Sequence, residues 1–123
     1  MGASASAAAA FYRDVAKTGE VWAIEDAGGF PAPMTSSGER AMPFWSSRSR
    51  AEAIIRRVAA YEGFEPVQLT LDAFMRDWLP GMEKDGLLVG VNWSGAKATG
   101  YDVPPGDVLQ NIRYHLGQTG SAA

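Results

Sequence analysis

The stretch LDAFMRDWLPGMEKDGLLVGVNW, residues 71–93, decides the fold class. Its first half is typical of an amphipathic helix, because apolar residues recur at helical spacing. Those residues are Leu71, Phe74, Met75, Trp78, Leu79 and Met82. Pro80 is expected to kink or restart this helix, since proline cannot donate a hydrogen bond to the preceding turn. After the Asp85-Gly86 turn, the run Leu87–Trp93 is typical of a strand that is buried on both faces.

Shorter helices and strands are predicted on both sides of this stretch, from periodicity and from cap and turn residues. Upstream, we expect a helix capped by Ser4 or Ser6 and ended by Gly19, a strand over Glu20–Glu25, at best an edge strand over Phe30–Met34, and a strand over Ala41–Trp45. These lead to a helix that runs from a Ser49/Glu52 capping box to Gly63, and to a strand over Glu65–Leu69 before the cap Thr70. Downstream, we expect a strand over Thr99–Val103, a helix opened by residues 104–107 and ended by Gly117, and a frayed tail over 118–123.

This order of elements predicts an α+β fold. Helices that alternate irregularly with short strands imply a mixed, mostly antiparallel sheet of about four to five strands, packed by about four helices. The 123 residues form a single globular domain with its core over about residues 5–117. A three-layer arrangement of helices and sheet is the alternative.

The composition excludes several classes of protein. The chain has no cysteine, so it has no thiol nucleophile and no disulfide framework, which fits a reducing compartment. Its net charge of −3 argues against a general nucleic-acid binder, because phosphate contacts need an excess of basic residues. Its apolar runs are shorter than the ~20 residues that cross a bilayer, so we expect no membrane partner.

Several of these segments, in this order, resemble a known family. They are a Val-Trp strand at residues 21–22, Pro43-Phe44-Trp45-Ser46, Trp78-Leu79-Pro80, and Asp85-Gly86 leading into Val89-Gly90-Val91-Asn92. The chain resembles the small bacterial proteins grouped as domain of unknown function DUF2750, over about residues 11–116. The resemblance implies a single-domain cytoplasmic protein of bacteria, and it implies no activity, cofactor or catalytic residue.

The side chains supply no catalytic constellation. His115, the single histidine, has no histidine or carboxylate at metal-ligand spacing, and we interpret it as a residue at the boundary of the core. Ser94 lacks the glycine pattern of a nucleophile elbow, and no glycine-rich segment matches a phosphate loop. The carboxylates that lie close in sequence, Asp72 with Asp77 and Glu83 with Asp85, are typical of solvated surface pairs. We therefore expect no catalytic residue, metal or cofactor.

The candidate binding residues lie in two short segments. They are Phe44, Trp45, Ser46, Arg48 and Arg50 in the first, and Asn92 and Trp93 in the second. Residues 46–50 place hydroxyls and two guanidinium groups at a predicted helix N-terminus, which is favourable for an anion, although helix capping alone explains the serine. Tryptophans at the ends of strands form pocket walls or interface anchors, or fill the core.

Two functions from different classes fit these residues. The first is a non-enzymatic protein-interaction or regulatory module in a bacterial cytoplasm, which binds an acidic or a basic protein partner. An immunity-type protein that blocks a toxin is one form of it. The alternative is a small-ligand or anion-binding protein, or an enzyme, with a Trp-lined pocket. A concave cavity at these residues favours the alternative, whereas a flat exposed patch favours docking.

Overall fold

The described part of the chain folds into five strands and the helices that pack on them. The computed structural model describes residues 2–120, with side chains through residue 117. The first elements are α1 (Ala3–Thr18), β1 (Glu20–Glu25), β2 (Ala41–Phe44), α2 (Arg48–Arg57) and the 3₁₀ turn η1 (Ala59–Tyr61). They are followed by β3 (Glu65–Thr70), α3 (Leu71–Ala73), the π-helical turn η2 (Phe74–Trp78), α4 (Leu79–Lys84), β4 (Leu88–Ser94), β5 (Thr99–Val103) and α5 (Pro105–Gly120).

The strands form two sheets that meet at one pair of tryptophans. β1 pairs with β3 in antiparallel fashion, and β4 lies between a parallel β2 and an antiparallel β5. Trp22 of β1 and Trp45, just after β2, exchange two backbone N–H···O hydrogen bonds of 2.8 Å, which join the sheets. The predicted α+β class and mostly antiparallel pairing are confirmed. Pro43 is tolerated because β2 is an edge strand, where a missing donor leaves no ladder bond unmade.

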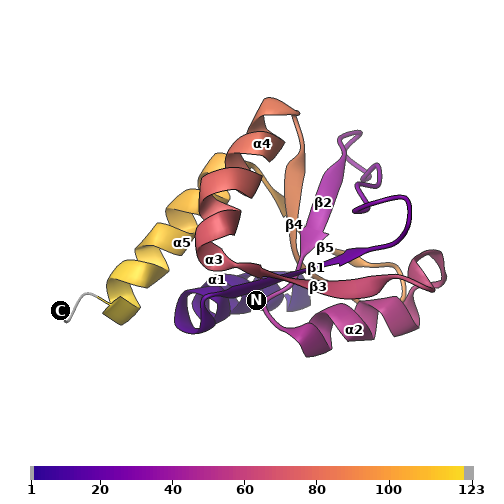
Figure 1. The fold of residues 1–123 in the computed structure, drawn as a ribbon, viewed down its shortest axis with the longest axis horizontal. Helices are drawn as coiled ribbons and strands as arrows, with labels where there is room; N and C mark the ends of the chain where they lie inside the picture. Colours follow the sequence, from indigo (N-terminus) through magenta and orange to yellow (C-terminus); the bar gives the residue numbers. More distant parts are fainter. Residues whose placement is uncertain (1, 121–123) are drawn as a thin grey trace.

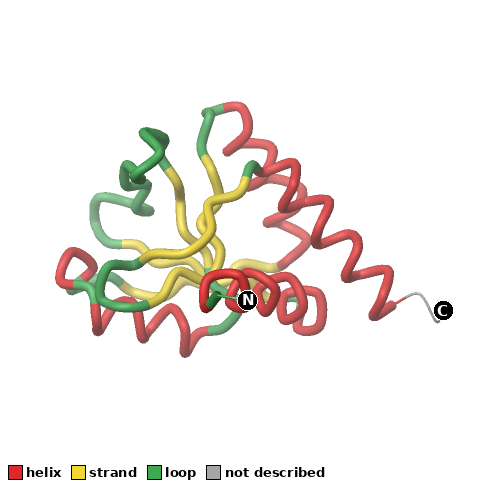
Figure 2. Tube along the Cα trace, turned by 180° about the vertical axis from the view of Figure 1, so that it is seen from behind, coloured by secondary structure: helices red, strands yellow, loops and turns green. Residues whose placement is uncertain are grey.

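Helices cover both faces of the strands. α2 packs against β1, β3 and β4, whereas α1, α4 and α5 pack together on the other face (Figures 1 and 2). β1 shows the division, since Val21 and Ala23 belong to one buried cluster and Trp22 and Ile24 to the other. Helices on both faces of the strands match the three-layer alternative. The strand pairing is mostly antiparallel, as the first prediction had it.

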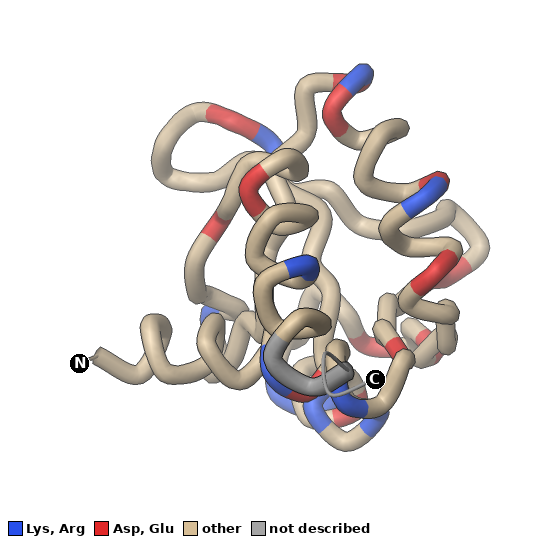
Figure 3. The backbone as a smooth tube through the Cα atoms, turned by 90° about the vertical axis from the view of Figure 1, so that its left-hand side faces the viewer, with Lys and Arg blue, Asp and Glu red and all other residues tan. Residues whose placement is uncertain are grey.

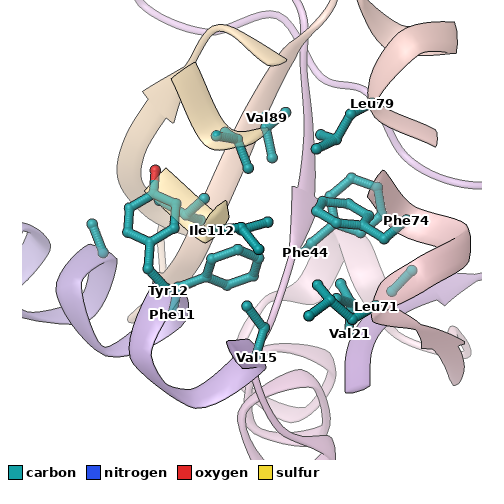
Figure 4. Packing of buried hydrophobic residues seen from close by; sticks show 14 of the residues in the cluster. Phe11, Tyr12, Val15, Val21, Phe44, Leu71, Phe74, Leu79, Val89 and Ile112 are labelled. Carbon is teal, nitrogen blue, oxygen red and sulfur yellow. The ribbon is translucent and has the colours of Figure 1, made fainter. Parts of the chain in front are cut away.

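The larger cluster lies beneath α1, α4 and α5. Figure 4 shows side chains from both helical and strand segments converging in it. Phe44 and Phe74 meet edge to face, with ring centroids 4.8 Å apart. Aromatic pairs in this geometry add about 0.5–1.5 kcal/mol to the free energy gained by burying their area. Phe11 of the first helix and Ile112 of the last helix are fully buried here.

The segment 71–84 forms one helical run with an irregular centre. The Thr70 hydroxyl caps it by accepting a hydrogen bond from the Ala73 N–H at 3.0 Å, as predicted. The turn before Pro80 is π-helical, and the Leu79 N–H bonds to the Phe74 carbonyl. The missing N–H of Pro80 therefore falls at the end of an already widened turn, which is the restart that the sequence predicts.

Several predicted helix ends are wrong. α1 starts from Gly2 with no side-chain cap, so neither Ser4 nor Ser6 caps it. α5 continues through Gly117 to Gly120, because nothing in the local backbone forces this glycine out of the helical conformation; the rest of the predicted tail, 121–123, lies outside the described residues. Residues 30–34 form only an isolated bridge, Met34 with Arg40, since Pro31 and Pro33 remove ladder donors.

The predicted cap and end of α2 are wrong as well. Ser47 is the cap, because its hydroxyl accepts from the Arg50 N–H at 3.3 Å, while Glu52 bonds to Arg48 and not back to Ser49. The helix ends at Arg57 and not at Gly63. Val58 turns to an extended conformation there and adds its side chain to the smaller buried cluster.

Candidate functional site

The two predicted binding segments meet in space, and most of their side chains are buried. Trp45 is fully buried, and its indole N–H donates to the Trp93 carbonyl at 2.8 Å. Phe44 is part of the larger core cluster. Burial of these rings removes them from contact with a partner, so they act as core.

A buried asparagine fixes the junction between the segments. The Asn92 side-chain oxygen accepts from the Ser46 backbone N–H at 2.9 Å. Its amide group donates to the Ala7 carbonyl at 3.0 Å and to the Ser46 hydroxyl oxygen at 3.1 Å. Asn92 has φ +51, in the left-handed region that asparagine tolerates better than most residues. It therefore ties α1, the end of β2 and β4 together.

Ser46 lacks the partners of a nucleophile. Its hydroxyl donates to the Asp14 carboxylate at 3.3 Å, and Asp14 also pairs with the exposed Arg13. The single histidine lies elsewhere, stacked on Tyr12, with its Nδ1 next to the Asn111 carbonyl. The Asp14 carboxylate is the base bonded to Ser46, and no histidine bonds to either residue in the described part of the chain. Ser46 and Asn92 are buried and Asp14 is partly buried, and we interpret the hydrogen bonds among these three residues as structural.

A bulge in the pairing of β4 with β5 turns the Trp93 side chain toward α2. The pairing of β4 with β5 shifts between Val91 and Ser94, at the positive-φ Asn92. A bulge of this kind re-aims the next side chain, and Trp93 belongs to the cluster beneath α2. Its indole N–H donates to the Asp102 carboxylate at 2.9 Å. Two cavities meet at this indole.

The first cavity, which we call the α2 cavity, has a volume of about 210 Å³. It lies between α2 and the start of the β4–β5 turn. Its lining residues are Ser49, Arg50, Ala53, Ile54, Arg57, Trp93, Ser94 and Gly95. Two of the predicted binding residues, Arg50 and Trp93, are therefore brought to one cavity.

The charge in the α2 cavity is uncompensated. Arg50 and Arg57 lie two turns apart on α2, on one face of the helix, and both residues line this cavity. Among the described residues, neither forms an ion pair. Arg48 differs, because it pairs with Glu52 at 3.2 Å and lies over the Trp22 ring, 5.6 Å from its centroid. Lys and Arg gather in the lower part of Figure 3, where Figure 1 places α2.

The second cavity, which we call the hairpin cavity, has a volume of about 410 Å³. It lies between residues 33–36, the η1 turn and the β4–β5 hairpin. Its apolar lining is Pro33, Met34, Val58, Ala60, Tyr61, Trp93 and Ala98, and its polar lining is Thr35, Ser36, Lys97, Thr99 and Asp102, with Gly100 between them. Burial raises the pKa of Asp102 from its ordinary value of 3.8, and the hydrogen bond from Trp93 opposes this shift.

Comparison with known proteins gives a family and nothing about activity. The family described as a protein of unknown function, DUF2750, matches residues 8–112, from within α1 to within α5. The chain belongs to the DUF2750 family. No curated protein matches this DUF2750 protein.

Metal ligands, membrane-spanning helices and paired carboxylates are the other features that the sequence of this DUF2750 protein raised. Within residues 2–120, no group of three or more His, Asp or Glu residues is placed to hold a metal ion. None of the helices described is long and apolar enough to cross a membrane. Asp72 and Asp77 both pair with Arg76 on the surface, as their spacing predicts.

The sequence analysis missed two residues that line the DUF2750 cavities, Arg57 and Asp102, and one that lies beneath their shared Trp93 wall, Gly90. Arg57 was not among the predicted binding residues, although its spacing of two helical turns from Arg50 was an available signal. No sequence pattern near Asp102 marks it as a site residue, because the indole that bonds to it, Trp93, comes from the neighbouring strand. Gly90, isolated in an apolar strand, was a signal for close approach of another group, and that group is the Trp93 ring.

Proposed function

We propose that this DUF2750 domain binds a small anionic ligand, bearing a phosphate or carboxylate group, in the α2 cavity. The observation that carries the proposal is the pair of arginines without ion-pair partners, Arg50 and Arg57, on the wall of one concave space. Guanidinium groups match the geometry of carboxylate and phosphate oxygens and form strong charge-assisted hydrogen bonds with them. An anion would supply the negative charge that the walls lack.

The rest of the cavity suits a ligand of limited size. Ser49 and Ser94 add hydroxyl donors, while Ile54 and Trp93 provide apolar surface. Typical drug-sized ligands occupy sites of about 300–1,000 Å³, so the volume of about 210 Å³ favours a smaller molecule. Trp93 is held by its bond to Asp102, which makes this wall rigid before binding.

Docking of an acidic protein on α2 is the second candidate. The favouring observation is that Arg56, like Arg57, is exposed and has no ion-pair partner among the described residues. A basic helix on a chain of net charge −3 would attract an acidic surface. We prefer the cavity because Phe44, Trp45 and Trp93, the aromatic anchors of a docking surface, are buried. In either form we propose a place in the bacterial cytoplasm, which the resemblance to the family suggested.

Arg57 and Arg56 provide a matched test, since only Arg57 lines the cavity. Inorganic phosphate and citrate are titrated into the ¹⁵N-labelled protein, and amide shifts of residues 49–57 and 93–95 are followed. Arg57→Glu is expected to weaken binding by about tenfold or more, whereas Arg56→Glu, with the same charge change, leaves it nearly unchanged. Equal weakening by both variants would support surface docking, and the absence of saturable shifts would refute the cavity proposal.

A further inference from the structure

We propose that the hairpin cavity is a second, separate binding site, which takes a zwitterionic ligand with an apolar side group, of the class of free α-amino acids. This site goes beyond the proposed anion site. The inference rests on two opposite charges, Asp102 and Lys97, that border one cavity without pairing with each other, over a largely apolar floor.

Asp102 is oriented but not neutralised. One carboxylate oxygen accepts from the Trp93 indole N–H at 2.9 Å, which fixes the direction of the group. The other oxygen has no hydrogen bond, and no cation pairs with Asp102 in the described part of the chain. Burial without a compensating cation is why the pKa of this carboxyl is raised. A ligand ammonium group would supply that cation.

Lys97 provides the opposite charge. It lies in the turn between β4 and β5 and borders the same cavity. No carboxylate within 4.0 Å accepts from it among the described residues, so its ammonium group is available to a ligand carboxylate. A ligand that carried only an amine would be repelled by Lys97, and one that carried only a carboxylate would be repelled by Asp102. The cavity thus discriminates against both single charges.

The remaining lining suits an apolar side group. Val58 and Tyr61 belong to the buried cluster under α2, and Met34 stands at the rim with 57% of its surface exposed. Methionine adapts its shape to different apolar groups. The volume of about 410 Å³ lies within the range of about 300–1,000 Å³ that is usual for small-molecule sites.

The test uses three probes of nearly the same shape. Free L-leucine carries both charges, isoamylamine lacks the carboxylate, and 4-methylpentanoate lacks the amine. Binding to the full chain is followed through the indole N–H resonance of Trp93, which donates to Asp102. Leucine is expected to bind at least about tenfold more tightly than either analogue. If leucine leaves this resonance unmoved at about 10 mM, or if either analogue binds as tightly, the proposal is overturned.

Two variants test which residue binds each charged group of the ligand. Asp102→Asn keeps an oxygen to accept from Trp93, and it is expected to weaken the binding of leucine and isoamylamine by about tenfold. Binding of 4-methylpentanoate should strengthen, because its carboxylate is no longer repelled. Lys97→Gln, in an exposed turn where folding is not at risk, is expected to weaken leucine and 4-methylpentanoate instead. Unchanged leucine binding in Lys97→Gln would overturn the zwitterion assignment even if Asp102→Asn fails to fold. Arg57→Glu serves as the control, because it removes the phosphate response of the α2 cavity and leaves leucine binding intact.

Discussion

The indole of Trp93 lies directly over Gly90, so closely that a Cβ atom added to this glycine would stand 2.3 Å from the ring atom Cε2. Both residues are buried in β4, so an added Cβ cannot be accommodated unless the indole shifts. The bulge at Asn92 is what allows one strand to fold its own tryptophan back over its own backbone. A glycine is therefore needed at position 90 for Trp93 to form the wall that both cavities share.

Gly90→Ala is expected to destabilise the fold and to displace Trp93. Overpacking of this kind costs about 1–3 kcal/mol, and the displaced indole would lose its bond to Asp102. Urea unfolding measures the free energy, and the Trp93 indole resonance reports the displacement. Gly117→Ala is the matched control, because nothing lies within 4 Å of the added Cβ on α5. It is expected to stabilise by about 0.5–1 kcal/mol, and a loss in Gly117→Ala equal to that of Gly90→Ala would contradict the steric explanation.

The cap of α2 yields a second prediction. Ser47→Ala removes the oxygen that accepts from the Arg50 N–H, and it is expected to lower the free energy of unfolding by about 1 kcal/mol. Ser49→Ala removes a hydroxyl whose hydrogen bond among the described residues is to the Ser47 hydroxyl and not to a helix N–H, so it should cost much less. Thermal and urea denaturation of both variants decide the matter. A larger loss in Ser49→Ala would restore the capping box that the sequence suggested.

The elements of this fold were predictable where their signal is local. Apolar spacing predicted the helical run from Leu71 to Met82, and β-branched and aromatic residues predicted β1 and β4, because these patterns reflect which side chains face the core. The three serines at 46, 47 and 49 are each chemically able to cap a helix. Which of them does so depends on where β2 ends against β4, and that is a tertiary property.

The candidate site was predictable only in part, for the same reason. Arg50 and Trp93 were expected in a binding region, and both line the α2 cavity. The role of Asn92 depends on the Ala7 carbonyl, 85 residues away in the sequence. The Trp93–Asp102 pair likewise depends on strand register. No local pattern encodes such contacts, so the sequence left pocket wall, interface anchor and core open for the tryptophans. Trp45 is core, and Trp93 is a buried wall of two cavities.

Asn92 should tolerate no other residue well. Asn92→Gly permits φ +51 but removes three hydrogen bonds, which should lower the free energy of unfolding by about 2–3 kcal/mol. Asn92→Ala removes the same bonds and adds left-handed strain, so it should lose about 1 kcal/mol more. Urea denaturation of the pair separates the two contributions. If Asn92→Gly matched the parent chain in stability, the bonds to Ser46 and Ala7 would have no energetic role.

The carboxyl of Asp102 should make stability fall as pH rises. Its pKa in the folded chain lies above the ordinary value of 3.8, because burial disfavours the charged form. Such a group contributes stability that is fully present below its unfolded pKa and is lost as pH rises through the folded pKa. Relative to Asp102→Asn, which does not ionise, the parent chain should therefore lose stability from about pH 4 upward and then level off. Tyr61, which also lines the cavity, has its pKa raised from 10.0 by burial, so it stays uncharged over this range.

Asp77 supplies the control of opposite sign for this experiment. The hydrogen bond and charge of Arg76 lower the pKa of Asp77, so its contribution is present above the unfolded pKa and is lost as pH falls. Relative to Asp77→Asn, the parent chain should gain stability as pH rises toward about 4 and then level off. Urea unfolding at a series of pH values between about 3 and 7 measures both differences. Parallel slopes for the two pairs would mean that Asp102 is not desolvated, and the uncompensated carboxylate in the hairpin cavity would lose its support.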